Sequence, residues 1–155
     1  MMARILSLAL LALPAAAFAQ PLPRDPLGSP MWEYHAGKLF AGAPVVFDDA
    51  VRVDLPMLAE NQHVLPVTVD ARSLEKVVRI VLFADLNPIP VAVEYEPVAA
   101  QAFLATRIKL DQRTPVRAAA LTADGVWHVA GGWVDAAGGG CSAPARPDWQ
   151  DTVIA

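Results

Sequence analysis

The chain has 155 residues, with 12 basic and 16 acidic side chains, a formal net charge of −4, 14 prolines and a single cysteine. One cysteine excludes an internal disulfide and a thiolate metal cluster, and the acidic balance lacks the basic surface of a nucleic-acid-binding protein. Prolines spread along the whole chain argue against a helical bundle, because proline breaks helix interiors. The length is typical of one domain.

The first 19 residues have the features of a secretory signal peptide. Arg4 gives a positive start, residues 5–13 form an apolar stretch, and Ala17-Phe18-Ala19 ends a run of small residues. A membrane anchor is the alternative, but the apolar stretch is too short to span a bilayer, and no later run is long and apolar enough. Cleavage after Ala19 leaves 155 − 19 = 136 residues with a net charge of −5, and predicts export to a periplasm.

Residues 20–42 predict an extended lead-in followed by a short helix. Residues 20–30 contain four prolines and show no periodicity. Residues 31–40 predict a helix with Ser29 as its N-cap and Pro30 at its first position. One apolar stripe is expected on this helix, made of Trp32, His35, Ala36, Leu39 and Phe40.

From residue 43 to residue 135 the pattern changes to short strands separated by turn signals. The eight predicted strands are 44–47, 51–55, 65–69, 77–83, 91–96, 103–110, 116–122 and 127–134. In the sixth, Leu104 and Ile108 face one side and Arg107 and Lys109 face the other. Residues 77–83 are almost uniformly apolar, which is typical of a strand covered on both faces. The spacing predicts an all-β fold, an antiparallel β-sandwich of immunoglobulin-like type, with a small barrel as the alternative.

The only cysteine lies in the last segment, residues 136–155, directly after Gly138, Gly139 and Gly140. Consecutive glycines give the backbone its widest freedom, so the segment predicts a flexible arm that carries the thiol of Cys141 about 20 Å from the sandwich. Such a thiolate could hold a substrate covalently for partner enzymes. The alternative is a buried cysteine that acts as a small hydrophobe, but the neighbouring sequence has no apolar pattern that would bury it.

The three histidines, His35, His63 and His128, show no metal-ligand spacing, and neither a metal site nor a cofactor is predicted. His128 belongs to the last predicted strand and could lower the pKa of the thiol if it lay near the arm. A hydrolase built from Cys141, His128 and Asp135 is conceivable. A nucleophile on a glycine tether is poorly placed for it, because catalysis needs fixed geometry.

Several stretches of the sequence resemble one known family. They are Asp25 to Trp32, Pro44 to Asp49, Phe83 to Pro90, Arg107 to Leu110, Thr114 to Arg117, Asp124 to His128 and Gly138-Gly139-Gly140-Cys141. Together they resemble SoxY, the sulfur-carrier subunit of the periplasmic thiosulfate-oxidising system. They are most similar to the SoxYZ-like carriers associated with quinoprotein dehydrogenases.

The resemblance implies that Cys141 is the covalent attachment point for sulfur intermediates and that the protein is a carrier without catalytic activity of its own. It further implies a SoxZ-like subunit or domain as partner, and a c-type cytochrome or quinoprotein dehydrogenase system. Ser142-Ala143-Pro144 stand where SoxY has two further glycines. The sequence stops at Ala155, so we expect either that the SoxZ-like partner is a separate chain or that the reading frame is truncated. An adaptor module, which would bind a dehydrogenase or cytochrome through its strand edges with the thiol incidental, is the second hypothesis.

Overall fold

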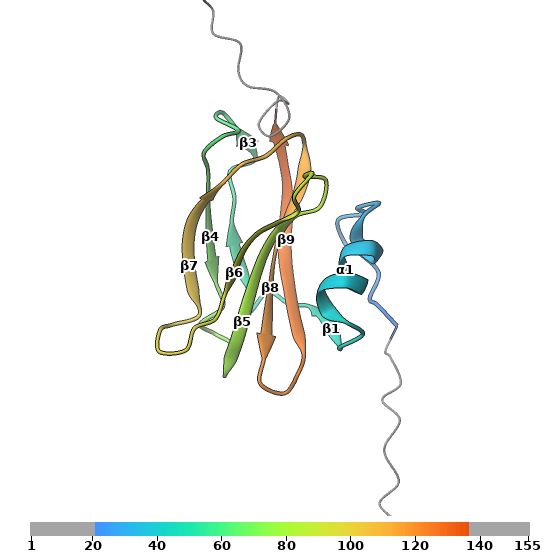
Figure 1. Ribbon diagram of the computed structural model, residues 1–155, viewed down its shortest axis with the longest axis vertical. Helices are drawn as coiled ribbons and strands as arrows, with labels where there is room; N and C mark the ends of the chain where they lie inside the picture. Colours follow the sequence, from blue (N-terminus) through green and yellow to red (C-terminus); the bar gives the residue numbers. More distant parts are fainter. Residues whose placement is uncertain (1–20, 137–155) are drawn as a thin grey trace, which may run out of the picture.

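The computed structural model describes residues 21–136, which form one helix and nine strands (Figure 1). The helix is α1 (Trp32–Phe40). The strands are β1 (Val45–Phe47), β2 (Arg52–Asp54), β3 (Leu58–Ala59), β4 (Leu65–Asp70), β5 (Val77–Ala84), β6 (Val91–Tyr95), β7 (Phe103–Ile108), β8 (Thr114–Thr122) and β9 (Trp127–Ala136).

The strands form two sheets that pack face to face. The larger sheet has the order β1-β9-β8-β5-β6, with β3 also paired to β9, and the smaller has the order β2-β4-β7. The pairs within this order are antiparallel except for two, since β1 and β3 both run parallel to β9. The arrangement confirms the predicted sandwich and excludes the barrel.

Two apolar cores separate three layers. The first fills the space between the sheets and includes Leu65, Ile80, Leu82 and Val116. The second lies on the opposite face of the larger sheet, where α1 packs against it, as Figure 1 shows. Strands β5 and β8 lie in the middle layer, so successive side chains of each enter alternate cores. The uniformly apolar pattern of residues 77–83 is explained in this way for Ile80 to Phe83, which are all buried.

Helix α1 has the predicted apolar stripe, but its start was predicted wrongly. Trp32, His35, Ala36 and Phe40 are buried against the sheet. The N-cap is Met31, which makes no side-chain capping hydrogen bond, and not Ser29. Ser29 lies two residues earlier, where its hydroxyl accepts a hydrogen bond from the Met31 amide at 3.3 Å. Among residues 21–136, no helix is long and apolar enough to cross a membrane.

The eight predicted strands are all present with their ends shifted by at most two residues, and the structure adds one strand. Strand β3 was not predicted at all, because two residues are too few to show a period. Strand β8 begins at Thr114 and includes Pro115, two residues before the predicted start at residue 116. Strand β9 continues to Ala136, two residues beyond the predicted end, because β3 pairs with its last two residues.

Strands β8 and β9 approach unusually closely at Gly131. A Cβ atom at this position would collide with the carbonyl oxygen of Val116 and lie 2.9 Å from the Cα of Arg117. At the neighbouring Gly132 the nearest atom to such a Cβ would be Cδ1 of Leu55 at 3.8 Å, an ordinary contact. Glycine is therefore required at Gly131 but not at Gly132.

This difference gives a matched pair of variants. Gly131→Ala should lower the free energy of unfolding by about 1–3 kcal/mol, because backbone atoms of β8 must move to make room. Gly132→Ala should be neutral or should stabilise by up to about 0.5 kcal/mol, since it removes freedom from the unfolded chain. Urea denaturation of both variants tests the assignment, and equal effects would contradict it.

Candidate functional site

The predicted carrier residue, Cys141, and the three glycines before it lie outside the described residues. The structure does describe the point from which that segment starts. Strand β9 ends at Ala136, five residues before Cys141, and it ends beside β3 at the top of Figure 1. We call this end of the sandwich the arm end.

The last residues of β9 are held on one side by β3. Beyond Val134, which pairs with Thr114 of β8, the register continues only through Leu58 opposite Asp135 and Ala59 opposite Ala136. The Asp135 amide donates to the carbonyl oxygen of Met57 at 2.9 Å. Strand β3 thus fixes the direction in which the chain leaves the sandwich.

An ion pair adds a second restraint at the same place. The Arg113 guanidinium donates to the Asp135 carboxylate at 2.6 Å and stacks over the Trp133 ring, 4.3 Å from its centroid. Both charged groups are largely exposed, so the pair contributes little to stability. The Trp133 indole donates to the carbonyl oxygen of Leu27 at 2.9 Å, which ties this part of β9 to the lead-in.

The histidines are spread over the molecule. Nε2 of the buried His35 donates to the carbonyl oxygen of Asp85 at 2.8 Å, and His63 is exposed in the loop before β4. Within residues 21–136, no three histidine, aspartate, glutamate or cysteine side chains are grouped closely enough to hold a metal ion.

His128 lies near the start of β9, and its Nδ1 donates to the Asp48 carboxylate at 2.7 Å. Hydrogen bonds from the Ala50 amide and from His128 lower the pKa of Asp48 below its usual value. Eight residues of extended strand place His128 about 26 Å from Ala136, whereas the arm to Cys141 spans at most about 20 Å. The distance disfavours thiol tuning by His128 and separates His128 from Asp135, the third member of the conceivable hydrolase triad.

A buried ionic network lies on the helix side of the larger sheet. The Arg117 side chain, 1% exposed, donates through Nε to both oxygens of Asp85 at 3.1 Å and through Nη2 to Asp25 at 2.8 Å. Its guanidinium also lies over the Trp32 ring, 4.8 Å from the centroid. One cation from β8 therefore binds the lead-in, the helix and the loop after β5.

The pKa of Asp25 reflects two opposed effects. Burial raises this pKa, but hydrogen bonds from Arg117 and from the Ser29 and Leu27 amides outweigh it, so that the pKa lies below its usual value. Asp25 therefore carries its negative charge at neutral pH and compensates Arg117.

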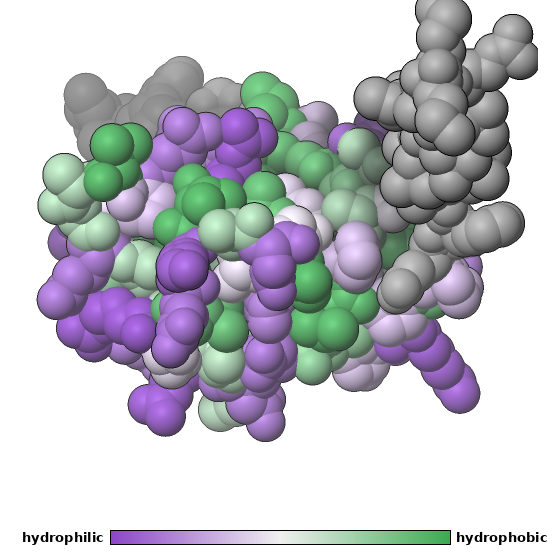
Figure 2. All heavy atoms as spheres, turned by 90° about the horizontal axis from the view of Figure 1, so that it is seen from below, coloured by the Kyte–Doolittle hydropathy of each residue, from purple (hydrophilic) through white to green (hydrophobic). Residues whose placement is uncertain are grey.

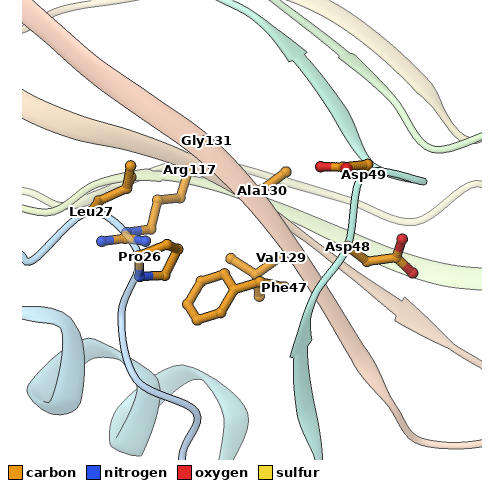
Figure 3. Close-up of a pocket in the computed structure, with 9 residues that line it drawn as sticks. All are labelled: Pro26, Leu27, Phe47, Asp48, Asp49, Arg117, Val129, Ala130 and Gly131. Atoms are coloured by element: carbon orange, nitrogen blue, oxygen red, sulfur yellow. The ribbon is translucent and has the colours of Figure 1, made fainter.

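An open cavity of about 520 Å³ adjoins this network (Figure 3). It is lined by Pro26, Leu27, Phe47, Asp48, Asp49, Arg117, Val129, Ala130 and Gly131. The Arg117 guanidinium is already engaged by two carboxylates, and Asp48 and Asp49 add negative charge on the opposite side of the cavity. An anion such as thiosulfate is poorly suited to this cavity, so cargo held there without a covalent bond is not supported.

The network of Arg117, Asp85 and Asp25 was not predicted from the sequence. One signal was available. Arg117 interrupts an otherwise apolar strand, and a charge inside such a strand requires a buried partner. The identity of that partner was not available, since Asp25 is 92 residues away.

Comparisons with known proteins place the chain in a family. The family model of the sulfur oxidation protein SoxY matches residues 36–141. The structure of the sulfur carrier protein SoxY from Chlorobium limicola f thiosulfatophilum is 19% identical, with a TM-score of 0.60, and the match covers 68% of this chain and 96% of that chain. No curated protein matches the chain.

Two superoxide reductases show weaker similarity. A putative enzyme from Thermotoga maritima is 12% identical, with a TM-score of 0.49 over 61% of this chain and 86% of that one. A neelaredoxin from Ignicoccus hospitalis is 13% identical, with a TM-score of 0.47 over 67% and 86%. These similarities are too low to support an inference about this chain.

The fold and the end of β9 define the class of protein. It is an immunoglobulin-like sandwich in which strand β9 is followed, five residues later, by the single cysteine. The SoxY family model covers more than half of the chain and includes Cys141. The chain therefore belongs to the SoxY family, which confirms the resemblance to SoxY found in the sequence.

The first test of the site concerns the buried network. Arg117→Met should lower the free energy of unfolding by about 3–5 kcal/mol, because two buried carboxylates lose their compensating charge. Arg107→Met, an exposed arginine on β7, should change it by less than about 0.5 kcal/mol. Both free energies are measured by thermal or urea unfolding. A loss in Arg117→Met as small as the loss in Arg107→Met would show that Arg117 does not support the fold.

The second test concerns His128. His128→Ala should leave the rate of alkylation of Cys141 by iodoacetamide unchanged between pH 6 and pH 8, because His128 lies about 26 Å of strand away from Ala136, where the cysteine segment starts. The alkylation rate is followed by intact-mass spectrometry on the full chain. A slower rate in the variant would restore the thiol-tuning role.

Proposed function

We propose that the protein is an exported sulfur carrier that holds sulfur intermediates covalently on Cys141 and presents them to partner enzymes. One observation carries the proposal: the match to the SoxY family model begins in the helix, at residue 36, and ends at residue 141, the cysteine itself. The Chlorobium relative is a sulfur carrier protein, which agrees with this role.

The geometry of β9 supports a carrier more than a catalyst. The strand is paired with β8 up to Val134 and with β3 up to Ala136, so the segment that follows starts from a fixed point. In the described part of the chain, His128 and Asp135 do not come together as a triad would require. Chemistry on the thiol is therefore assigned to partner proteins.

The proposed cycle has two balanced steps. In loading, the Cys141 thiolate and the outer sulfur of thiosulfate form an S–S bond, and the two electrons released pass to a c-type cytochrome or a quinoprotein dehydrogenase system. In unloading, a hydrolase adds water to the terminal sulfonate, which leaves as sulfate with two protons, while the outer sulfur stays on Cys141 as a persulfide. Thiosulfate is the example here, and other sulfur anions would load by the same oxidation.

The partners and the location follow from the same family membership. A SoxZ-like subunit or domain is proposed as the permanent partner. The leader of residues 1–19 would direct export, so that the mature chain starts at Gln20. An oxidising periplasm is a suitable place for a thiol that alternates between free and sulfur-bound states.

Intact-mass spectrometry of protein isolated from native cells tests the proposal. We expect a mature chain that starts at Gln20 and carries a thiosulfonate or sulfane adduct, which a reductant removes. Cys141→Ser should abolish the adduct and change the free energy of unfolding by less than about 0.5 kcal/mol, whereas Ser142→Ala should load like the wild type. An unmodified thiol in wild-type protein would favour the adaptor hypothesis instead, and a large loss of stability in Cys141→Ser would indicate a buried structural cysteine.

A further inference from the structure

Exposed apolar side chains are grouped at the arm end of the sandwich. Met57, 86% exposed, directly precedes β3, Leu58, 57% exposed, lies on β3, and Val64, 44% exposed, lies in the loop between β3 and β4. Ile89, 80% exposed, lies in the loop between β5 and β6. Because β5 ends and β8 begins at the same end as β9 finishes, the two loops lie at one end of the molecule (Figure 1).

Hydrogen bonds join these loops into one surface. The Asn87 side chain donates to the carbonyl oxygen of Lys109 at 2.8 Å and accepts from the Asp111 amide at 3.1 Å. The Leu110 amide in turn donates to the carbonyl oxygen of Gln62 at 2.9 Å, in the loop that leads to Val64. The loop before β8 therefore bridges Ile89 to the β3 side. We call Met57, Leu58, Val64 and Ile89 the apolar rim.

The opposite end of the sandwich is different in character. It also exposes apolar side chains, among them Val98 and Phe103, but Arg72 lies over the Phe103 ring and pairs with Asp70. Figure 2 views the molecule from that end and shows hydrophobic and hydrophilic side chains interspersed. Val98, 92% exposed in the loop between β6 and β7, is as open to solvent as Met57.

We propose that the apolar rim is the surface on which the enzymes that load and unload Cys141 dock. This inference rests on the proposed carrier function. Five residues separate Ala136 from Cys141, so the thiol stays within about 20 Å of the end of β9. An enzyme that takes the thiol into its active site must therefore contact the arm end, and the rim occupies that end.

The charges beside the rim indicate the chemistry of the partner surface. Arg113 and Asp135 pair with each other, and the exposed Glu60 and Lys109 have opposite signs. No single charge dominates among these groups, so long-range attraction contributes little to docking. The fitting partner is a protein whose active-site entrance is surrounded by apolar side chains, and docking should depend only weakly on salt.

The test compares two ends of the same molecule. Fully reduced full-length protein is added to native cell extract together with a sulfur anion. The anion is one that loads the wild type, and thiosulfate is tried first. The appearance of the Cys141 adduct is followed by mass spectrometry. Met57→Asp combined with Ile89→Asp should slow loading about tenfold or more, since the apolar side chains that become buried when two proteins dock dominate the binding energy. Val98→Asp, the matched control at the opposite end, should load at the wild-type rate.

A small reagent separates docking from changes in the thiol itself. Iodoacetamide should alkylate Cys141 at equal rates in the wild type, the double variant and the control, and all three should unfold at the same temperature. Loading of the double variant at the wild-type rate would overturn the inference while leaving the carrier function intact. Loss of a stoichiometric companion chain from the purified double variant would assign the rim to a permanent interface and also overturn it. A wild-type chain that no sulfur anion loads would contradict the proposed function, and the inference with it.

Discussion

The arrangement of the layers depends on one buried cation. Arg117 sits in β8, a strand covered on both faces, where an uncompensated charge would cost several kcal/mol. Asp85 and Asp25 compensate this charge, and their positions fix the loop after β5 and the lead-in. Asp85 fixes the loop after β5, and its own carbonyl oxygen also accepts a hydrogen bond from His35 of the helix. Asp25, bound to Arg117, holds the lead-in against the sheet. The helix layer is thus bonded to the sheet and not merely packed against it.

The same region determines how β9 lies. Gly131 allows β9 to pass against the backbone of Arg117, and Trp133 donates to Leu27 of the lead-in that Asp25 anchors. Farther along, β8 and β3 hold β9 as far as Val134 and Ala136. The rigid centre of the molecule therefore continues to the point from which the cysteine segment starts. A carrier benefits from such a fixed starting point, because it limits the volume that the thiol can search.

Much of the fold could be predicted from local pattern. Strand β7 showed clear alternation, and the stripe of α1 was visible in Trp32, His35 and Phe40, since both periods arise within a few residues. Strand β3 could not be predicted, because its pairing with Asp135 and Ala136 depends on residues far away in sequence. The partners of Arg117 were hidden for the same reason. Cys141 could be proposed as the carrier residue from the sequence because it is the only thiol, whereas the apolar rim needs the folded positions of separate loops.

Strand β3 contributes direction more than tether length. Without it, β9 would be held only to Val134, and the tether to Cys141 would grow from five residues to seven. The effective concentration of a tethered group falls roughly as the −3/2 power of tether length, so the thiol would still keep about 60% of its local concentration. That loss is too small to explain a dedicated strand. Pairing of Asp135 and Ala136 with β3 does, however, place the start of the tether next to Met57 and Leu58, so that a partner docked on those side chains lies where the thiol emerges.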